Sequence, residues 1–339
     1  MDMGLKGRLT YGETDGNQIM VEEDMKIDKV ACVGAGLIGR GWATLFAWKG
    51  YKVTLQDLKD KALENASSQI RRNFEFLAEK RLLKGETCED CFGRIDFTTD
   101  IVEAVSDADY VQESVYEDYK VKKEVFKLMD SAAQPHAILA SSSSTLKMSI
   151  IQEATEKPER CVIAHPWNPP HLMPLVEVVP GKKTSPQTVR KTKDFMIKLG
   201  KVAVVQKKET VGTIGNRLAA ALWREAIDLV YRGVAEVEDI DKAVSASLGI
   251  RWAVLGPYLS YHLGGGRGGI EYYLRHLGSA MENRWRTLAA WTSMPPLAEK
   301  KIVQGVKETE LVKEKSVDEL SRWRDEKLVE LLKVLYYLK

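Results

Sequence analysis

The sequence lacks the features that mark membrane, secreted or nucleic-acid-binding proteins. Nowhere do roughly 18 apolar residues run together, so no membrane-spanning helix is expected. The N-terminus has no basic-then-apolar pattern of a signal peptide, so we expect a cytoplasmic protein with no membrane partner. Lys and Arg number 50 against 48 Asp and Glu, so no basic field favours a nucleic-acid partner.

Cysteine is also scarce, with only four in the chain. Cys32 and Cys161 lie in apolar runs and are predicted to be small core residues. Cys88 and Cys91 form one C-x-x-C pair, but a zinc site needs more ligands and no second pair exists. We therefore predict reduced, structural cysteines and no metal site.

A complete strand–turn–helix–strand unit is present over residues 29–57. Residues 30–33 form a short apolar run that fits a buried parallel strand. A Gly-x-Gly-x-x-Gly turn follows, then helical periodicity that stops at Gly50, and then a second strand at 53–55. This order of elements is typical of a dinucleotide-binding domain.

Each part of this unit suits a bound dinucleotide. The first glycine permits a tight turn, the second lets the backbone approach a pyrophosphate, and the third lets helix and strand pack closely. Asp57 ends the second strand, where an acid can hold a ribose 2′-hydroxyl and would repel a 2′-phosphate. NAD is therefore the predicted cofactor, and its predicted contacts here are Gly34, Gly36, Leu37, Ile38, Gly39 and Asp57.

Strands and helices alternate through the rest of the first half, which favours a doubly wound parallel sheet. Apolar and β-branched runs predict strands at 95–98, 108–113, 138–140, 160–164, 175–179 and 201–205. Helical spacing of apolar residues predicts helices at 60–84, 120–132 and 186–199.

From about residue 213 the pattern changes to helices, at 215–231, 236–248 and 320–339. We predict an α/β protein, a Rossmann-type doubly wound sheet followed by an all-helical C-terminal domain. The predicted divisions are a loose N-terminal extension at 1–26 (with Met20 or Met25 as an alternative start), an NAD-binding domain at 27–208, and a helical substrate and dimerisation domain at 209–339.

Oxidation of an alcohol also needs a group that takes a proton, and histidine suits this near neutral pH. His165 ends a predicted strand beside a proline-rich turn, and Glu177 on the next strand could lie beside its imidazole. Ser144 follows a strand and could hydrogen-bond a substrate oxygen, while Asn216 begins a helix that could close the site. The alternatives are a buried structural histidine, a surface glutamate and a helix-capping asparagine.

The motifs together resemble the L-3-hydroxyacyl-CoA dehydrogenase superfamily over nearly all of residues 29–338. The matching blocks are VGAGLIGRG, the serine run that ends in Ser144-Thr145-Leu146, His165-Pro166-Trp167-Asn168-Pro169, Leu175-Val176-Glu177 and Gly215-Asn216-Arg217-Leu218. The resemblance implies reversible oxidation of an L-3-hydroxyl group to a 3-keto group with NAD.

The resemblance also implies roles for individual residues. His165 is the implied base and Glu177 its partner, with Ser144 and Asn216 as polar catalytic-site residues. The implied cofactor contacts are Glu117, Lys122, Ser144 and Asn168. Lys80 falls where the acyl-CoA enzymes place a lysine that contacts coenzyme A.

The small-molecule substrate stays open among three branches of this superfamily, which act on 3-hydroxyacyl-CoA, L-gulonate and L-carnitine. Residues 221–226 and 251–253 resemble the carnitine branch, whereas 169–170 with 174–177 resemble the gulonate branch. A quaternary ammonium would need aromatic faces such as Trp252 and Tyr261. A coenzyme A thioester would need cations such as Lys80 and would place the chain in fatty acid metabolism.

We further expect a homodimer through the helical domain, because nothing else in the chain is obviously available to cover the apolar stripe of its last helix. The alternative is that this helix folds back on its own subunit. Two other classes compete: a non-enzymatic NAD-binding or crystallin-like structural protein, and a decarboxylating dehydrogenase with a lysine base, which the His-Pro-Trp-Asn-Pro block disfavours.

Overall fold

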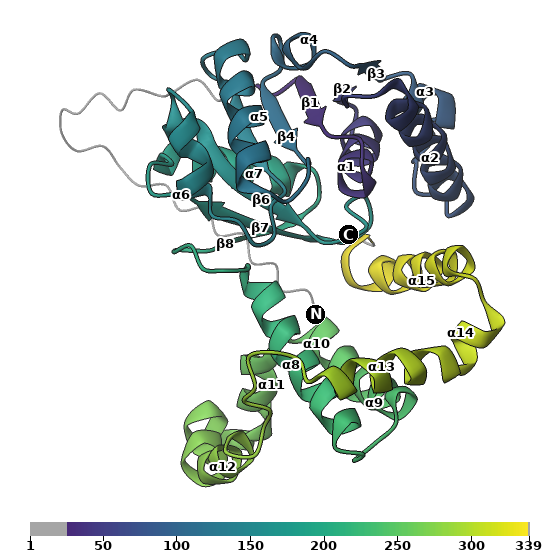
Figure 1. The fold of residues 1–339 in the computed structure, drawn as a ribbon, viewed down its shortest axis with the longest axis vertical. Helices are drawn as coiled ribbons and strands as arrows, with labels where there is room; N and C mark the ends of the chain where they lie inside the picture. The colour runs from purple at the N-terminus through teal and green to yellow at the C-terminus, as the bar shows by residue number, and fades with distance from the viewer. Residues whose placement is uncertain (1–25, 338–339) are drawn as a thin grey trace, which may run out of the picture.

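The computed structural model describes residues 26–337 (Figure 1). The predicted extension before residue 26, its two alternative start methionines and the last two residues of the predicted C-terminal helix lie outside this range.

A single eight-stranded sheet organises the first half, in the order β3-β2-β1-β4-β5-β6-β7-β8. All neighbouring strands are parallel except β6 and β7, which are antiparallel. The strand order reverses at β1, between β2 and β4, and ligands bind at such a switch point in open α/β sheets. The strands are β1 (Lys29–Val33), β2 (Lys52–Gln56), β3 (Ile95–Thr98), β4 (Tyr110–Glu113), β5 (Ile138–Ser141), β6 (Cys161–Pro166), β7 (Leu175–Pro180) and β8 (Val202–Val205).

Helices cover both faces of this sheet, so the predicted doubly wound fold is confirmed. Alternate residues of β1 point to opposite faces: Cys32 belongs to one apolar core and Val33 to the other. The first core is formed with α1 (Leu37–Trp48), α2 (Asp60–Glu79) and α7 (Pro186–Lys198). The second is formed with α4 (Ile101–Val105), α5 (Tyr119–Ala132) and α6 (Met148–Ile151).

The predicted helix at 60–84 was too long. The observed α2 ends at Glu79, and Arg81 and Lys84 have positive φ angles of 59° and 52°. The left-handed conformation cannot continue a right-handed helix, and the turn it makes buries Leu83 in the first core. The chain then forms the short helix α3 (Cys88–Phe92).

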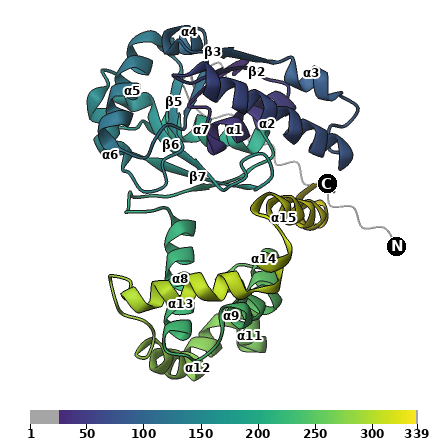
Figure 2. The ribbon, with the colours of Figure 1, turned by 45° about the vertical axis from the view of Figure 1, so that its right-hand side comes forward.

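The second half is helical and lies beside the sheet domain, beyond β8 (Figures 1 and 2). Its long first helix, α8, packs against α13. Among residues 26–337, no helix combines the length and apolarity that a membrane crossing requires. The helices are α8 (Ile214–Tyr231), α9 (Val237–Ala243), α10 (Ile250–Val254), α11 (Pro257–Gly264), α12 (Gly269–Trp285), α13 (Pro296–Glu308), α14 (Glu310–Glu314) and α15 (Val317–Leu332).

The last helix returns to the sheet domain (Figure 2). Val329 and Leu332 of α15 are buried in the same apolar core as α1 and α2. Arg322 of α15 forms an ion pair of 2.8 Å with Glu79. The expectation that nothing in the chain covers this helix was therefore wrong: α15 folds back on its own subunit, because its apolar residues complete the core beside α2.

Candidate active site

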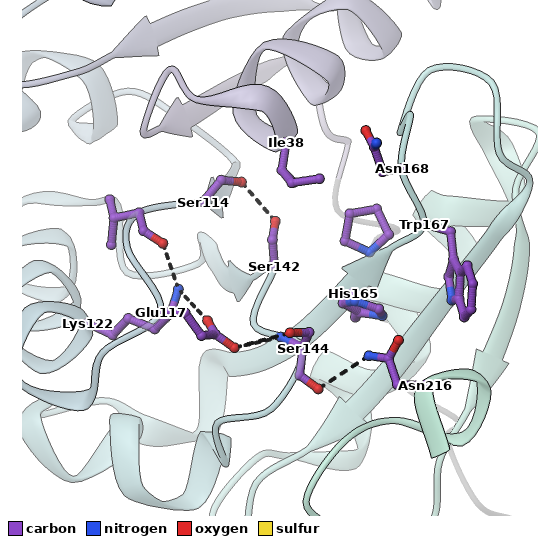
Figure 3. A pocket seen from close by; sticks show the side chains of 12 residues that line it. Ile38, Ser114, Glu117, Lys122, Ser142, Ser144, His165, Trp167, Asn168 and Asn216 are labelled. Carbon is purple, nitrogen blue, oxygen red and sulfur yellow. Dashed lines mark hydrogen bonds and ion pairs between the residues drawn. The ribbon is translucent and has the colours of Figure 1, made fainter. Parts of the chain in front are cut away.

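A pocket of about 360 Å³ opens where α1, the ends of β4, β5 and β6, and the start of α8 converge (Figure 3). These strand ends surround the switch point of the sheet. The pocket is lined by Ile38, Ser114, Val115, Glu117, Lys122, Ser142, Ser144, His165, Pro166, Trp167, Asn168 and Asn216.

The glycine turn beside this pocket has the shape that a dinucleotide requires. Gly34 has φ of +97°, and a Cβ atom on Gly39 would lie 1.7 Å from the Gly34 carbonyl oxygen. A Cβ atom on Gly36 would meet nothing within 4 Å, so space is open at the N-terminus of α1, where no side chain caps the amides. The Asp57 carboxylate accepts a hydrogen bond of 2.8 Å from the Ala35 amide, which holds it beside the turn.

Strand pairing places the two central candidate residues together. The antiparallel register of β6 and β7 sets His165 opposite Glu177. Nδ1 of the imidazole lies 3.2 Å from Oε2 of the carboxylate. Because Nδ1 is engaged and the ring lines the pocket, Nε2 is the nitrogen left for a molecule bound there.

The Glu177 carboxylate is buried and heavily hydrogen-bonded. Oε2 accepts from the Thr213 hydroxyl at 2.6 Å and the Trp167 indole at 3.3 Å, and Oε1 accepts from the Gly215 amide at 2.8 Å. Burial alone would raise the pKa of Glu177, but the hydrogen bonds from His165, Thr213, Gly215 and Trp167 lower it to about 2. Glu177 is therefore ionised near neutral pH, and its carboxylate faces Nδ1 of the imidazole.

A second network of buried charges lies behind the pocket wall that faces His165. Nζ of Lys122 lies 2.6 Å from Oε1 of Glu113 and 3.4 Å from Oε2 of Glu117. Oε1 of Glu117 accepts from the Ser143 hydroxyl at 2.7 Å and the Ser144 amide at 2.9 Å. Although burial opposes it, the hydrogen bonds from the serine segment and the Lys122 charge lower the pKa of Glu117. This network orients the chain at Ser144.

Residues distant in sequence meet across the pocket. Nδ2 of Asn216, from the first turn of α8, lies 3.5 Å from the Ser144 carbonyl oxygen. Asn168 and Trp167 come from the segment after β6 and form another wall (Figure 3). The structure thus brings one set of predicted residues together around the pocket: Ile38, Glu117, Lys122, Ser144, His165, Asn168 and Asn216.

Buried contacts support the segment that carries Asn168. Lys201 donates hydrogen bonds to the carbonyl oxygens of Pro170 and Met173, the latter at 2.8 Å. Burial, with repulsion from Lys49, lowers the pKa of the Lys201 amine to about 7. The turn after Asn168 is therefore held against the sheet domain.

Three residues proposed for substrate binding do not line this pocket. Lys80 lies 3.0 Å from Glu79 and 3.6 Å from Glu326 of α15. Trp252 lies in α10, and the Tyr261 ring in α11 packs against Tyr273 at 5.0 Å between centroids. Their roles stay predictions.

The residues of the site that were not predicted include Glu113, Ser114, Ser142, Trp167 and Thr213. Glu113 offered a signal, because it is a carboxylate at the end of an apolar strand, and Trp167 lies within the His-Pro-Trp-Asn-Pro block. Thr213 and Ser114 offered none, since their contacts depend on how separate segments pack.

Comparisons with known proteins agree with this geometry. Residues 29–210 match the 3-hydroxyacyl-CoA dehydrogenase NAD binding domain, and residues 212–306 match the C-terminal domain of the same family. An L-carnitine dehydrogenase of Bacillus cereus is 38% identical over 91% of this chain and 93% of its own length. An L-carnitine dehydrogenase of Oceanobacillus iheyensis is also 38% identical, over 90% of this chain and 97% of its own.

The crystal structure of 5-formyl-3-hydroxy-2-methylpyridine 4-carboxylic acid 5-dehydrogenase, described as an NAD⁺-dependent dismutase, has a similar fold. It superposes with a TM-score of 0.79 at 32% identity, covering 91% of this chain and 99% of the other. The predicted family and the predicted NAD cofactor are thereby confirmed.

Proposed function

The chain belongs to the 3-hydroxyacyl-CoA dehydrogenase family, and on that premise we propose that it oxidises the 3-hydroxyl group of a small free hydroxy acid, with L-carnitine as the first candidate. It is an NAD-dependent oxidoreductase. The observation that carries the proposed chemistry is the buried Glu177 carboxylate on Nδ1 of His165, which leaves Nε2 for the pocket.

In this proposal His165 is the general base. NAD, when bound, supplies the hydride acceptor. Nε2 of His165 takes the hydroxyl proton, and the ionised Glu177 stabilises the imidazolium that results. Ser144 and Asn216, on the facing walls, hydrogen-bond the substrate oxygen and orient its carbon toward the cofactor side of the pocket.

The residues around the glycine turn suit the cofactor. The open space at Gly36 and the uncapped amides of α1 receive the pyrophosphate, and Asp57 holds the adenosine ribose in a way that disfavours a 2′-phosphate. We assign Glu117, Lys122 and Asn168 to the nicotinamide side, because all three line the pocket that contains His165.

Two observations favour a free acid over a coenzyme A thioester. Lys80, the cation proposed to hold a coenzyme A phosphate, is already paired with Glu79 and with Glu326 of α15. Trp167 gives the pocket wall an aromatic side chain, and a quaternary ammonium is attracted to aromatic faces.

A substrate panel tests this proposal. We expect NADH formation, followed by absorbance, to show a kcat/KM for L-carnitine at least about tenfold above those for L-gulonate and 3-hydroxybutyryl-CoA. Lys80→Ala should leave the KM for carnitine unchanged, whereas Trp252→Ala and Tyr261→Ala report whether the helical domain adds aromatic contacts. The choice of substrate would be overturned by a higher kcat/KM for the thioester than for carnitine, together with a raised KM for the thioester in Lys80→Ala. In that case the rise in KM should be smaller at high salt, because charges are screened there. No turnover of any substrate would favour the non-enzymatic alternative.

We also propose a homodimer through the helical domain. Although α15 packs on its own subunit, many apolar side chains elsewhere in this domain are more than half exposed, and this apolar surface is available for an interface. These residues include Leu218, Trp223, Val254, Tyr258, Leu259, Leu263, Leu274 and Trp285.

Light scattering at micromolar concentration is therefore expected to give twice the chain mass of 38.1 kDa. Leu274→Glu should shift the population toward monomer, because a charge in an apolar interface is costly to desolvate. Leu58→Glu is the matched control, since Leu58 is equally apolar and 85% exposed but lies in the sheet domain. A single species at 38.1 kDa in the unmodified protein would reject the dimer.

A further inference from the structure

Ser114 occupies a position that neither the motifs nor the proposed reaction uses. It directly follows β4 at the switch point of the sheet and lines the pocket. A Cβ atom on Gly34 would lie 2.8 Å from the Ser114 carbonyl carbon, and one on Gly39 would lie 3.5 Å from its Cβ. The Ser114 side chain is therefore next to the glycine turn.

The neighbouring Ser142 hydroxyl receives two hydrogen bonds. The Trp42 indole donates at 3.1 Å and the Gln112 side-chain amide at 2.8 Å. An indole N–H can only donate, and the Gln112 amide is oriented by the Ala164 carbonyl, which accepts from the same nitrogen at 3.2 Å. The Gln112 oxygen in turn accepts from the Tyr110 hydroxyl at 3.0 Å.

These bonds set the direction of the next one. With both lone pairs of its oxygen accepting, Ser142 has only its hydrogen left, and Ser114 Oγ lies 2.8 Å away (Figure 3). Ser142 therefore donates and Ser114 accepts. Within residues 26–337, the Ser114 hydroxyl makes no other hydrogen bond, so its own hydrogen is available to a molecule in the pocket.

Reversing this direction would leave a buried donor without an acceptor. If Ser114 donated to Ser142, the oxygen of Ser142 would have to accept three hydrogen bonds, from Trp42, Gln112 and Ser114, although it has only two lone pairs. Trp42 and Gln112 are both buried, and orphaning a buried N–H is costly. The network consequently keeps the Ser114 hydroxyl as a donor.

We propose that Ser114 is a cofactor-binding residue whose hydroxyl donates a hydrogen bond to an oxygen acceptor in the nicotinamide half of NAD. Its place between the glycine turn and the His165 pocket sets three candidate acceptors: a phosphate oxygen, a hydroxyl of the adjacent ribose, and the carboxamide oxygen. All three share the same chemistry, an oxygen lone pair facing a fixed O–H donor. Ser114 takes no part in proton transfer.

Calorimetric titration of Ser114→Ala with NADH, ADP-ribose and AMP tests the proposal. We expect the Kd for NADH to rise about tenfold, as for one hydrogen bond to a ligand, while the Kd for AMP is unchanged. A matching rise for ADP-ribose would identify a phosphate or ribose oxygen, and a rise for NADH alone would identify the carboxamide oxygen.

Ser131→Ala is the matched control, since Ser131 lies on the exposed surface of α5, away from the pocket. An NADH Kd within about twofold of the unmodified protein would overturn the proposal, as would an equal loss of affinity for AMP. No substrate is present in these titrations, so their outcome is independent of the proposed reaction.

Discussion

Replacing His165 with glutamine is expected to lower kcat by roughly 10²–10⁴ while NADH still binds. The pocket contains one imidazole, and its Nδ1 is held by the ionised Glu177, so that Nε2 can take a proton. Glutamine keeps a polar side chain of similar length but cannot accept a proton near neutral pH. Steady-state kinetics with the best substrate of the panel, together with NADH titration, measure both quantities.

His136→Gln is the control, because His136 is exposed and pairs with Asp109 away from the pocket. Its kcat should equal that of the unmodified protein. Glu177→Gln should cost less than His165→Gln, because Glu177 acts by orienting and stabilising the imidazole. Unchanged turnover in His165→Gln would rule out the proposed base.

Lys122→Met is expected to lower the free energy of unfolding by about 3–5 kcal/mol. The Lys122 amine and the Glu113 carboxylate are both fully buried, 2.6 Å apart. Methionine fills similar space but leaves Glu113 as an unpaired charge in the core, still facing only the Ser141 hydroxyl and the Val115 amide. Chemical denaturation monitored by circular dichroism measures the loss.

The adjacent residue supplies a matched control. Lys123 forms an exposed ion pair with Glu153, which water already screens, so Lys123→Met should change stability little. The double variant Lys122→Met with Glu113→Gln should recover part of the loss, because the buried charge is then removed. Equal stability of Lys122→Met and Lys123→Met would show that the buried pair contributes nothing.

This charge network also connects stability to the site. Lys122 forms an ion pair with Glu117, and Glu117 accepts a hydrogen bond from the Ser144 amide. Removing the Lys122 amine is therefore expected to make the Ser144 segment, which lies opposite His165 in the pocket, less well ordered. A loss of NADH affinity alongside the loss of stability would support the cofactor role proposed for Glu117 and Lys122.

Much of the fold could be predicted from local pattern. Glycine spacing, apolar runs and strand–helix alternation located the nucleotide unit and the strands of the sheet, and the motif blocks identified the family. The end of α2 was misjudged because charged helix formers continue past Glu79, whereas the positive φ of Arg81 is imposed by burial of Leu83. The docking of α15 was misjudged because an apolar stripe does not say which surface will cover it.

The sequence by itself determined the glycine turn, the strands of the sheet and the chemistry of the motif residues, since these are properties of neighbouring residues. Only the tertiary structure decided which side chains meet. The Thr213 hydroxyl reaches Glu177 from 36 positions away, and Arg322 reaches Glu79 from 243. Such contacts depend on strand register and on the packing of the whole core, and no local pattern specifies either. The direction of the hydrogen bond between Ser142 and Ser114 also depends on tertiary structure, because it follows from the hydrogen bonds that Trp42 and Gln112 donate to Ser142.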